Sequence, residues 1–159
     1  MSKTIYQGKI LNLKLLDQKW EIVEHAEAVA IVAMNEGKIL GVKQHRPAIG
    51  ATTWEIPAGL IDEGETPEAA AHRELAEETQ LKAELELLTQ FYTSPGFTNE
   101  KIYLFKATKL SPAQGELDED EDLEPLWLEP KKLWQEIQTG KLASSSPSVL
   151  ALHMVLSQA

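Results

Sequence analysis

The sequence predicts one α+β domain, a mixed β-sheet with helices packed on it, and three observations carry that prediction. Strand-like segments dominate the first two thirds of the chain, and two of the three predicted helices close it. This order is typical of an α+β or sandwiched mixed-sheet fold and differs from the regular alternation of βαβ units. With 159 residues and 43% hydrophobic content, the chain can bury one core without disulfides, and it has no cysteine.

The first 26 residues are predicted to form a small β appendage, with the main domain covering residues 27–159. Residues 9–25 alternate apolar and polar side chains on both sides of a turn at residues 17–19, which predicts a β-hairpin. We expect this appendage to contribute to dimerisation, for reasons of family resemblance given below.

A second predicted hairpin opens the main domain. Residues 28–34 and 38–46 are rich in β-branched and apolar side chains, and they flank Asn35, Glu36 and Gly37, a turn composition. The nearly continuous apolar run AVAIVAM predicts a strand that is buried on both faces. The chain is then irregular as far as TWEIPAG (53–59).

A helix over residues 67–79 has a clear start signal. Thr66 is placed to cap it, Pro67 stands at the first helical position where its missing N–H costs nothing, and Glu68 faces the positive end of the helix. Further along, residues 81–92 and 101–110 are predicted strands around the loop TSPGFTNE, and an acidic run (116–124) precedes two predicted helices, 130–139 and 146–157.

The charge of the chain excludes some functions. A net charge of -10, with 25 acidic and 15 basic side chains, argues against nucleic-acid binding, which needs clustered lysine and arginine. No segment approaches the roughly 18 apolar residues that a membrane span requires, and no export signal is recognisable. We therefore expect a cytoplasmic protein that binds neither nucleic acid nor membranes. An anionic ligand would need a metal ion or local basic residues.

The predicted helix 67–79 carries three glutamates on one face. Glu74, Glu77 and Glu78 are spaced i, i+3 and i+4, so their carboxylates repel one another. One interpretation is a solvated acidic face neutralised by Arg73 or Lys82. The other is a site for a hard cation, because carboxylate oxygens without histidine or thiolate select Mg²⁺ or Mn²⁺.

The context of these glutamates resembles the Nudix box. Gly59, five residues, Glu65, seven residues and RELAEE (73–78) follow its spacing, and Leu75 and Leu81 satisfy its aliphatic positions. The departure is Gln80, where the family has glycine. Glycine there supplies a left-handed conformation after the helix, which glutamine adopts at a cost of about 1 kcal/mol.

The resemblance implies a Nudix-type α/β/α sandwich and hydrolysis of a nucleoside diphosphate linked to another group. Carried over by position, Glu74 and Glu78 would be the principal ligands of Mg²⁺ or Mn²⁺, and Glu77 a further ligand or a contact to water. The carbonyl of Ala58 would complete the protein ligands. Arg73, paired with Glu65, would orient the catalytic helix.

Within the family, the segment VKQHRPAIGATTWEIPAGLIDEGE and the later SPGFTNE resemble the ADP-ribose pyrophosphatase branch, which carries a proline where this chain has Pro95. That branch implies Mg²⁺-dependent hydrolysis of ADP-ribose to AMP and ribose 5-phosphate. It also implies a homodimer in which the N-terminal appendages exchange between subunits.

In the same branch a glutamate from a loop near the C-terminus orients or deprotonates the attacking water. The acidic run supplies two positional matches, Glu119 first and Glu121 second. The alternative interpretation of this run is a solvated charge cluster without a catalytic role.

Substrate contacts are also predicted. Arg46 suits a diphosphate because a guanidinium binds phosphate oxygens in a bidentate manner, and Glu100 matches a family position near the substrate or metal. Glu55 is either a structural strand residue or a site carboxylate. Phe97 and Trp54 either stack on a base or ribose or simply pack.

Two alternative functions stay open. One is hydrolysis of another nucleoside diphosphate derivative, such as a nucleotide sugar, a flavin dinucleotide or a dinucleoside polyphosphate. The other is a non-catalytic sensor of an ADP-ribose-like ligand, which the intact glutamate face disfavours because a sensor does not need three adjacent like charges.

Overall fold

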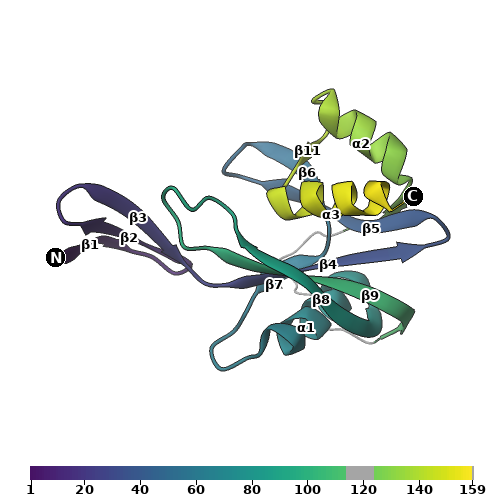
Figure 1. Cartoon of the computed structure of the whole chain (residues 1–159), viewed down its shortest axis with the longest axis horizontal. Coiled ribbons are helices and arrows are strands. Elements are labelled where there is room, and N and C mark those ends of the chain that lie inside the picture. Colours follow the sequence, from purple (N-terminus) through teal and green to yellow (C-terminus); the bar gives the residue numbers. More distant parts are fainter. Residues whose placement is uncertain (114–123, 159) are drawn as a thin grey trace.

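The computed structural model describes residues 1–113 and 124–158. It is an α+β sandwich: α1 covers one face of a curled mixed sheet, α2 and α3 cover the other, and a small separate sheet extends from one end (Figure 1). The predicted fold class is confirmed. The helices are α1 Pro67–Thr79, α2 Pro130–Gln138 and α3 Ser146–Ser157; the strands are β1 Ser2–Gln7, β2 Leu11–Leu16, β3 Trp20–His25, β4 Ala28–Asn35, β5 Lys38–Arg46, β6 Ala51–Glu55, β7 Ala58–Leu60, β8 Leu81–Tyr92, β9 Lys101–Pro112, β10 Glu124–Leu128 and β11 Ala143–Ser144.

The separate N-terminal sheet contains three antiparallel strands in the order β1-β2-β3. The predicted hairpin corresponds to β2 and β3, but the sequence did not predict β1. All six residues of β1 are exposed, so this strand has no buried face that would leave a period of two in its sequence.

The main sheet has the strand order β11-β6-β5-β4-β9-β8, with β10 and β7 as further partners of β5 and β4. Strand β4 pairs with β9 in parallel, but with β5 only through the two residue pairs next to their turn. The start of β4 pairs instead with β7. Because β7 inserts there, the chain enters the loop before α1 directly from the middle of the sheet.

A hydrophobic core lies on each face of the sheet. Residues of α1, including Ala70, Ala71 and Leu75, pack on one face together with Val29 and Ile31. Residues of α2 and α3, including Leu133 and Leu152, pack on the other face with the alternate side chains of β4. As predicted, β4 is therefore buried on both faces. No helix in the described part of the chain is both long and apolar enough to cross a membrane.

The boundaries of α1 agree with the prediction, and Thr66 accepts a hydrogen bond from the backbone N–H of Ala69 at 3.2 Å. The helix ends at Gln80, whose backbone is left-handed with φ 58° and ψ 30°. Its N–H donates to the carbonyl of Ala76 at 2.9 Å. The glutamine therefore adopts the conformation that glycine provides most easily at this position.

Candidate active site

A cleft of about 1140 Å³ lies between the N-terminal sheet, the β5–β6 hairpin, α1 and the loop between β8 and β9. Most of the residues that sequence analysis singled out line it, although they come from distant parts of the chain. These are Arg46, Glu55, Ala58, Arg73, Glu74, Glu77, Phe97 and Glu100. The walls also include Gly59, His25, Thr53 and the residues 144–147 that lead into α3.

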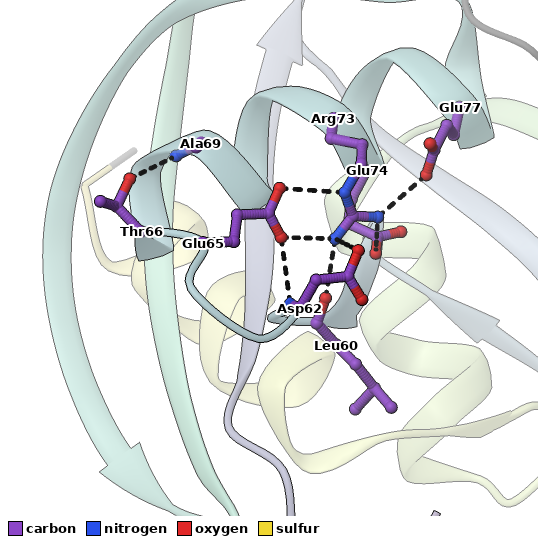
Figure 2. A network of polar contacts seen from close by, with 8 residues as sticks. All are labelled: Leu60, Asp62, Glu65, Thr66, Ala69, Arg73, Glu74 and Glu77. Carbon is purple, nitrogen blue, oxygen red and sulfur yellow. Dashed lines mark hydrogen bonds and ion pairs between the residues drawn. The ribbon is translucent and has the colours of Figure 1, made fainter.

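Arg73 connects the loop before α1 to the acidic face of the helix (Figure 2). Its Nε and Nη2 donate to the two carboxylate oxygens of Glu65 at 3.0 and 2.8 Å. Its Nη1 donates to Glu74 at 2.7 Å and to Glu77 at 3.0 Å, and Nη2 also reaches the carbonyl of Leu60 at 2.9 Å. One guanidinium thus offsets the repulsion between neighbouring carboxylates and fixes the loop to the helix.

The electrostatics of this cluster follow from those contacts. Hydrogen bonds from Arg73 hold the pKa of Glu65 below its ordinary value, and the Glu65 side chain is only 16% exposed. Hydrogen bonds to Glu65, and then to Glu74 and Glu77, raise the pKa of Arg73 further above its ordinary value. Both partners are therefore charged throughout the neutral range.

Glu78 is buried at 4% exposure, and its Oε2 accepts a hydrogen bond from the backbone N–H of Ala58 at 3.2 Å. Next to Ala58, Gly59 lies against the carboxylate of Glu74: a Cβ at Gly59 would come within 2.0 Å of Glu74 Cδ. A side chain at this position would therefore displace the Glu74 carboxylate. Strand β7 passes directly beside two carboxylates of α1, and a glycine there leaves the Glu74 carboxylate in place.

The donor set at this position fits a hard divalent cation. Glu74, Glu77 and Glu78 offer carboxylate oxygens, and Ala58 lies beside Glu78, so the ligand chemistry is that of Mg²⁺ or Mn²⁺. In residues 1–113 and 124–158, no three acidic, histidine or cysteine side chains converge in the arrangement of a formed metal centre. Two of the three glutamates instead accept hydrogen bonds from Arg73.

Arg46 and Glu55 form a bidentate ion pair at the far wall of the cleft. Nε and Nη2 of Arg46 donate to Oε1 and Oε2 of Glu55 at 2.8 and 2.7 Å. The hydroxyl of Thr53 donates to Glu55 Oε1 at 2.7 Å. Burial alone would raise the pKa of Glu55, but the hydrogen bonds from Arg46 and Thr53 outweigh it and hold that pKa below its ordinary value.

The loop between β8 and β9 forms the remaining wall. Its carbonyl at Phe97 accepts the N–H of Val23 at 2.7 Å, which ties the loop to β3. Phe97 is 55% exposed and lines the cleft, whereas Trp54 is fully buried in the core and does not. The stacking interpretation is therefore wrong for Trp54.

Glu100 makes contacts that the sequence did not predict. Its Oε2 accepts a hydrogen bond from the hydroxyl of Thr93 at 2.7 Å, and its Oε1 lies 3.5 Å from Nδ1 of His25. His25, Thr53 and Thr93 all line the cleft, and none was a predicted site residue. Of these three, only Thr53 could have been found from the sequence: it stands two residues before Glu55, and side chains two residues apart on a strand lie on the same face. Glu119 and Glu121 lie outside the described residues.

Comparison with known proteins identifies the family. A profile of the NUDIX domain matches residues 24–152. The chain belongs to the Nudix family. As predicted from its box, it is a Nudix pyrophosphohydrolase.

Similar proteins agree with this assignment. The ADP-ribose pyrophosphatase of Bacillus subtilis (strain 168) is 46% identical over 132 residues, which cover 76% of this chain and 71% of the relative. The methanol dehydrogenase activator of Bacillus methanolicus is 36% identical over 99% of this chain and 92% of its own. Among solved structures, an ADP compounds hydrolase matches with a TM-score of 0.79 at 23% identity, covering 99% of this chain and 91% of that one. That last likeness concerns the fold.

Proposed function

We propose that this Nudix enzyme hydrolyses the diphosphate bond of ADP-ribose, giving AMP and ribose 5-phosphate, with Mg²⁺ (or Mn²⁺) as cofactor. The observation that carries the proposal is the gathering of Arg73, Glu74 and Glu77 of the box helix and of Arg46 around one cleft of about 1140 Å³, with the buried Glu78 bonded to Ala58 in its wall. That volume suits a ligand the size of a sugar nucleotide. The 46% identical relative named ADP-ribose pyrophosphatase supports this substrate.

In this proposal, Glu74, Glu77, Glu78 and the carbonyl of Ala58 hold the metal. The cation, when bound, neutralises the diphosphate and makes an attacking water more acidic. Arg73 and Glu65 fix the helix relative to the loop that precedes it, because Arg73 donates hydrogen bonds to Glu65 in the loop and to Glu74 on the helix. A shift of the helix relative to that loop would displace all three carboxylates together.

The remaining roles concern substrate and water. Arg46 binds phosphate oxygens, and Phe97, half exposed on the opposite loop, stacks on the base or a ribose. Glu100 contacts the substrate or the metal from the same loop. Glu119 or Glu121 takes the proton from the attacking water. These last two assignments rest on family resemblance.

We further propose a homodimer, with the N-terminal sheet as its contact element, in the cytoplasm. The exposed apolar side chains of that sheet support the dimer: Ile5 is 52% exposed, Tyr6 58% and Trp20 55%. Equilibrium sedimentation should give twice the mass of the 17.7 kDa chain. A monomer at assay concentrations would remove this proposal without affecting the chemistry.

A panel of nucleoside diphosphate derivatives, assayed with Mg²⁺ and resolved by product, tests the function. ADP-ribose should give AMP and ribose 5-phosphate at a higher kcat/KM than nucleotide sugars, flavin dinucleotide or dinucleoside polyphosphates. If another member is preferred, the substrate assignment changes but the reaction class stays. If ADP-ribose binds in a calorimeter and no member is hydrolysed, the chain is a sensor.

The relative named methanol dehydrogenase activator favours a second candidate, activation of a dehydrogenase. The rate of a purified methanol dehydrogenase, with and without this chain, tests it. A Glu78→Gln variant that still activates would separate activation from hydrolysis.

A further inference from the structure

The cleft contains one ion pair that lies apart from the metal-binding helix. Among the described residues that line the cleft, only Arg46 and Arg73 are lysine or arginine. Arg73 donates to Glu65, Glu74, Glu77 and the carbonyl of Leu60. Arg46 donates through Nε and Nη2 to Glu55. The two arginines are thus held by different anchors.

The strand register explains how Glu55 reaches Arg46. In the β5–β6 pair, Arg46 is opposite Ala51, and Glu55 is opposite Val42. Side chains two residues apart share a face, so Arg46, Thr53 and Glu55 all point to the cleft side. Thr53 stands between the ion-pair partners on its strand. Arg46 therefore extends back along the hairpin, away from the residue opposite it, to reach the carboxylate.

The burial of the pair is asymmetric. The Glu55 side chain is 6% exposed and that of Arg46 is 44% exposed. Thr53, at 2% exposure, bonds the carboxylate from behind. Glu55 is therefore a buried, ionised anchor in the wall, and Arg46 is the more exposed member of the pair.

The donors around Glu55 fit an anchoring role. Each of its oxygens accepts an N–H from Arg46, and Oε1 accepts the Thr53 hydroxyl as well. An arginine held at both Nε and Nη2 loses much of its rotational freedom before a ligand arrives, so less entropy is lost on binding.

We propose that Glu55 is a positioning residue for Arg46: with Thr53 behind it, the buried carboxylate holds the guanidinium in the geometry that meets the diphosphate of the substrate. This deepens the proposed function and rests on it. It resolves the two interpretations of Glu55 in favour of a side chain that acts through another residue and contacts neither substrate nor metal.

The test is a double-mutant cycle of Glu55→Gln and Arg46→Lys, with kcat and KM for ADP-ribose. A glutamine amide offers an N–H where the guanidinium needs an acceptor, so Glu55→Gln should lower kcat/KM about 10-fold to 100-fold, mainly through KM. A lysine cannot form the two parallel bonds, so in the Arg46→Lys background the same change should cost about twofold or less.

Three further measurements sharpen the cycle. The Mg²⁺ concentration for half-maximal activity should stay within about twofold in Glu55→Gln, because Glu55 holds no metal. Thr53→Val, which removes the hydroxyl, should lower kcat/KM about 2-fold to 10-fold, and Thr53→Ser should restore it. Glu84→Gln, at an exposed strand carboxylate paired with Lys109 and remote from the cleft, is the matched control and should leave the kinetics unchanged. Thermal unfolding of each variant checks the fold.

Equal losses from Glu55→Gln in both backgrounds, or unchanged kinetics with lower stability, would overturn the proposal, because the pair would then be only structural. A large shift in the Mg²⁺ requirement would overturn it too. If the Arg46→Lys variant had the same kcat and KM as the wild type, the positioning role of Glu55 would also be overturned. The proposed function would still stand in that case, provided that the wild type hydrolyses ADP-ribose. If the wild type hydrolyses none of these substrates, the affinity for ADP-ribose measured without metal still tests the positioning role of Glu55. The Glu55→Gln substitution should then weaken this affinity about 10-fold, and an unchanged affinity would overturn the role.

Discussion

Gln80 offers a sharp test of how the box helix ends. Its backbone is left-handed at φ 58°, ψ 30°, a conformation that costs a residue with a Cβ about 1–2 kcal/mol. Glycine relieves that cost but gives the unfolded chain more freedom, which offsets about 0.4–1 kcal/mol. With the middle values of the two terms, about 1.5 and about 0.7 kcal/mol, the net gain for glycine over alanine at this position is about 0.8 kcal/mol.

The measurement compares Gln80→Gly with Gln80→Ala by urea unfolding. Alanine removes the side chain and its contacts but keeps the Cβ, so the difference between the two variants isolates the backbone. Gln80→Gly should have the higher midpoint with an unchanged m value, and a melting temperature about 1–4 °C higher. Gln90→Gly, the same substitution at an exposed position inside β8, should destabilise by about 0.5–1 kcal/mol.

Two results would refute this reasoning. If Gln80→Gly is no more stable than Gln80→Ala, the left-handed backbone at Gln80 does not carry the expected strain. If Gln80→Gly gains activity severalfold with no change in stability, the glutamine impairs the catalytic helix itself. Gln80 carries none of the predicted metal ligands, so we expect the Mg²⁺ requirement to be unchanged.

Three other perturbations test the site. Gly59→Ala should raise the Mg²⁺ needed for half-maximal activity at least about 10-fold, since its Cβ would lie 2.0 Å from Glu74 Cδ; an unchanged requirement would mean that Glu74 holds no metal. Glu65→Gln should destabilise at pH 7 by about 1–3 kcal/mol. Folding lowers the pKa of Glu65 from 4.5, so its contribution to the free energy of unfolding is present above pH 4.5 and is lost as the pH falls through the pKa of the folded state. The free energies of unfolding of the wild type and of the variant should therefore become equal in acid. Phe97→Ala should raise KM for ADP-ribose about 5-fold to 10-fold with little change in kcat; an unchanged KM would leave Phe97 without a role in binding.

Local signals in the sequence predicted most of the elements. The Thr66 cap and Pro67 placed the start of α1, and the alternation in residues 81–92 placed β8, because these patterns report burial and capping within a short stretch. Strand β1 escaped because both of its faces are exposed. Strand β11 has two residues and exists only through its parallel pairing with β6, a long-range contact that no local pattern encodes.

The residues of the site likewise include some that a local pattern predicts and some whose contacts depend on distant parts of the chain. The spacing of Glu74, Glu77 and Glu78 fixes their common helix face, so the acidic cluster was predictable. The pair of Arg46 with Glu55 depends on the register of a hairpin. The approach of His25 to Glu100 depends on the docking of the β8–β9 loop against β3. These contacts join residues whose neighbours in sequence give no sign of the partner.

The central claim is that the glutamate face of α1 supports hydrolysis of ADP-ribose, and one comparison tests it most directly. Release of AMP from ADP-ribose is measured at saturating Mg²⁺ for the wild type and for Glu78→Gln, the buried carboxylate beside Ala58. The wild type should release AMP and ribose 5-phosphate in equal amounts, and the variant should lose about 10²-fold to 10³-fold in kcat. No AMP from the wild type, or near wild-type turnover by the variant, would contradict the account.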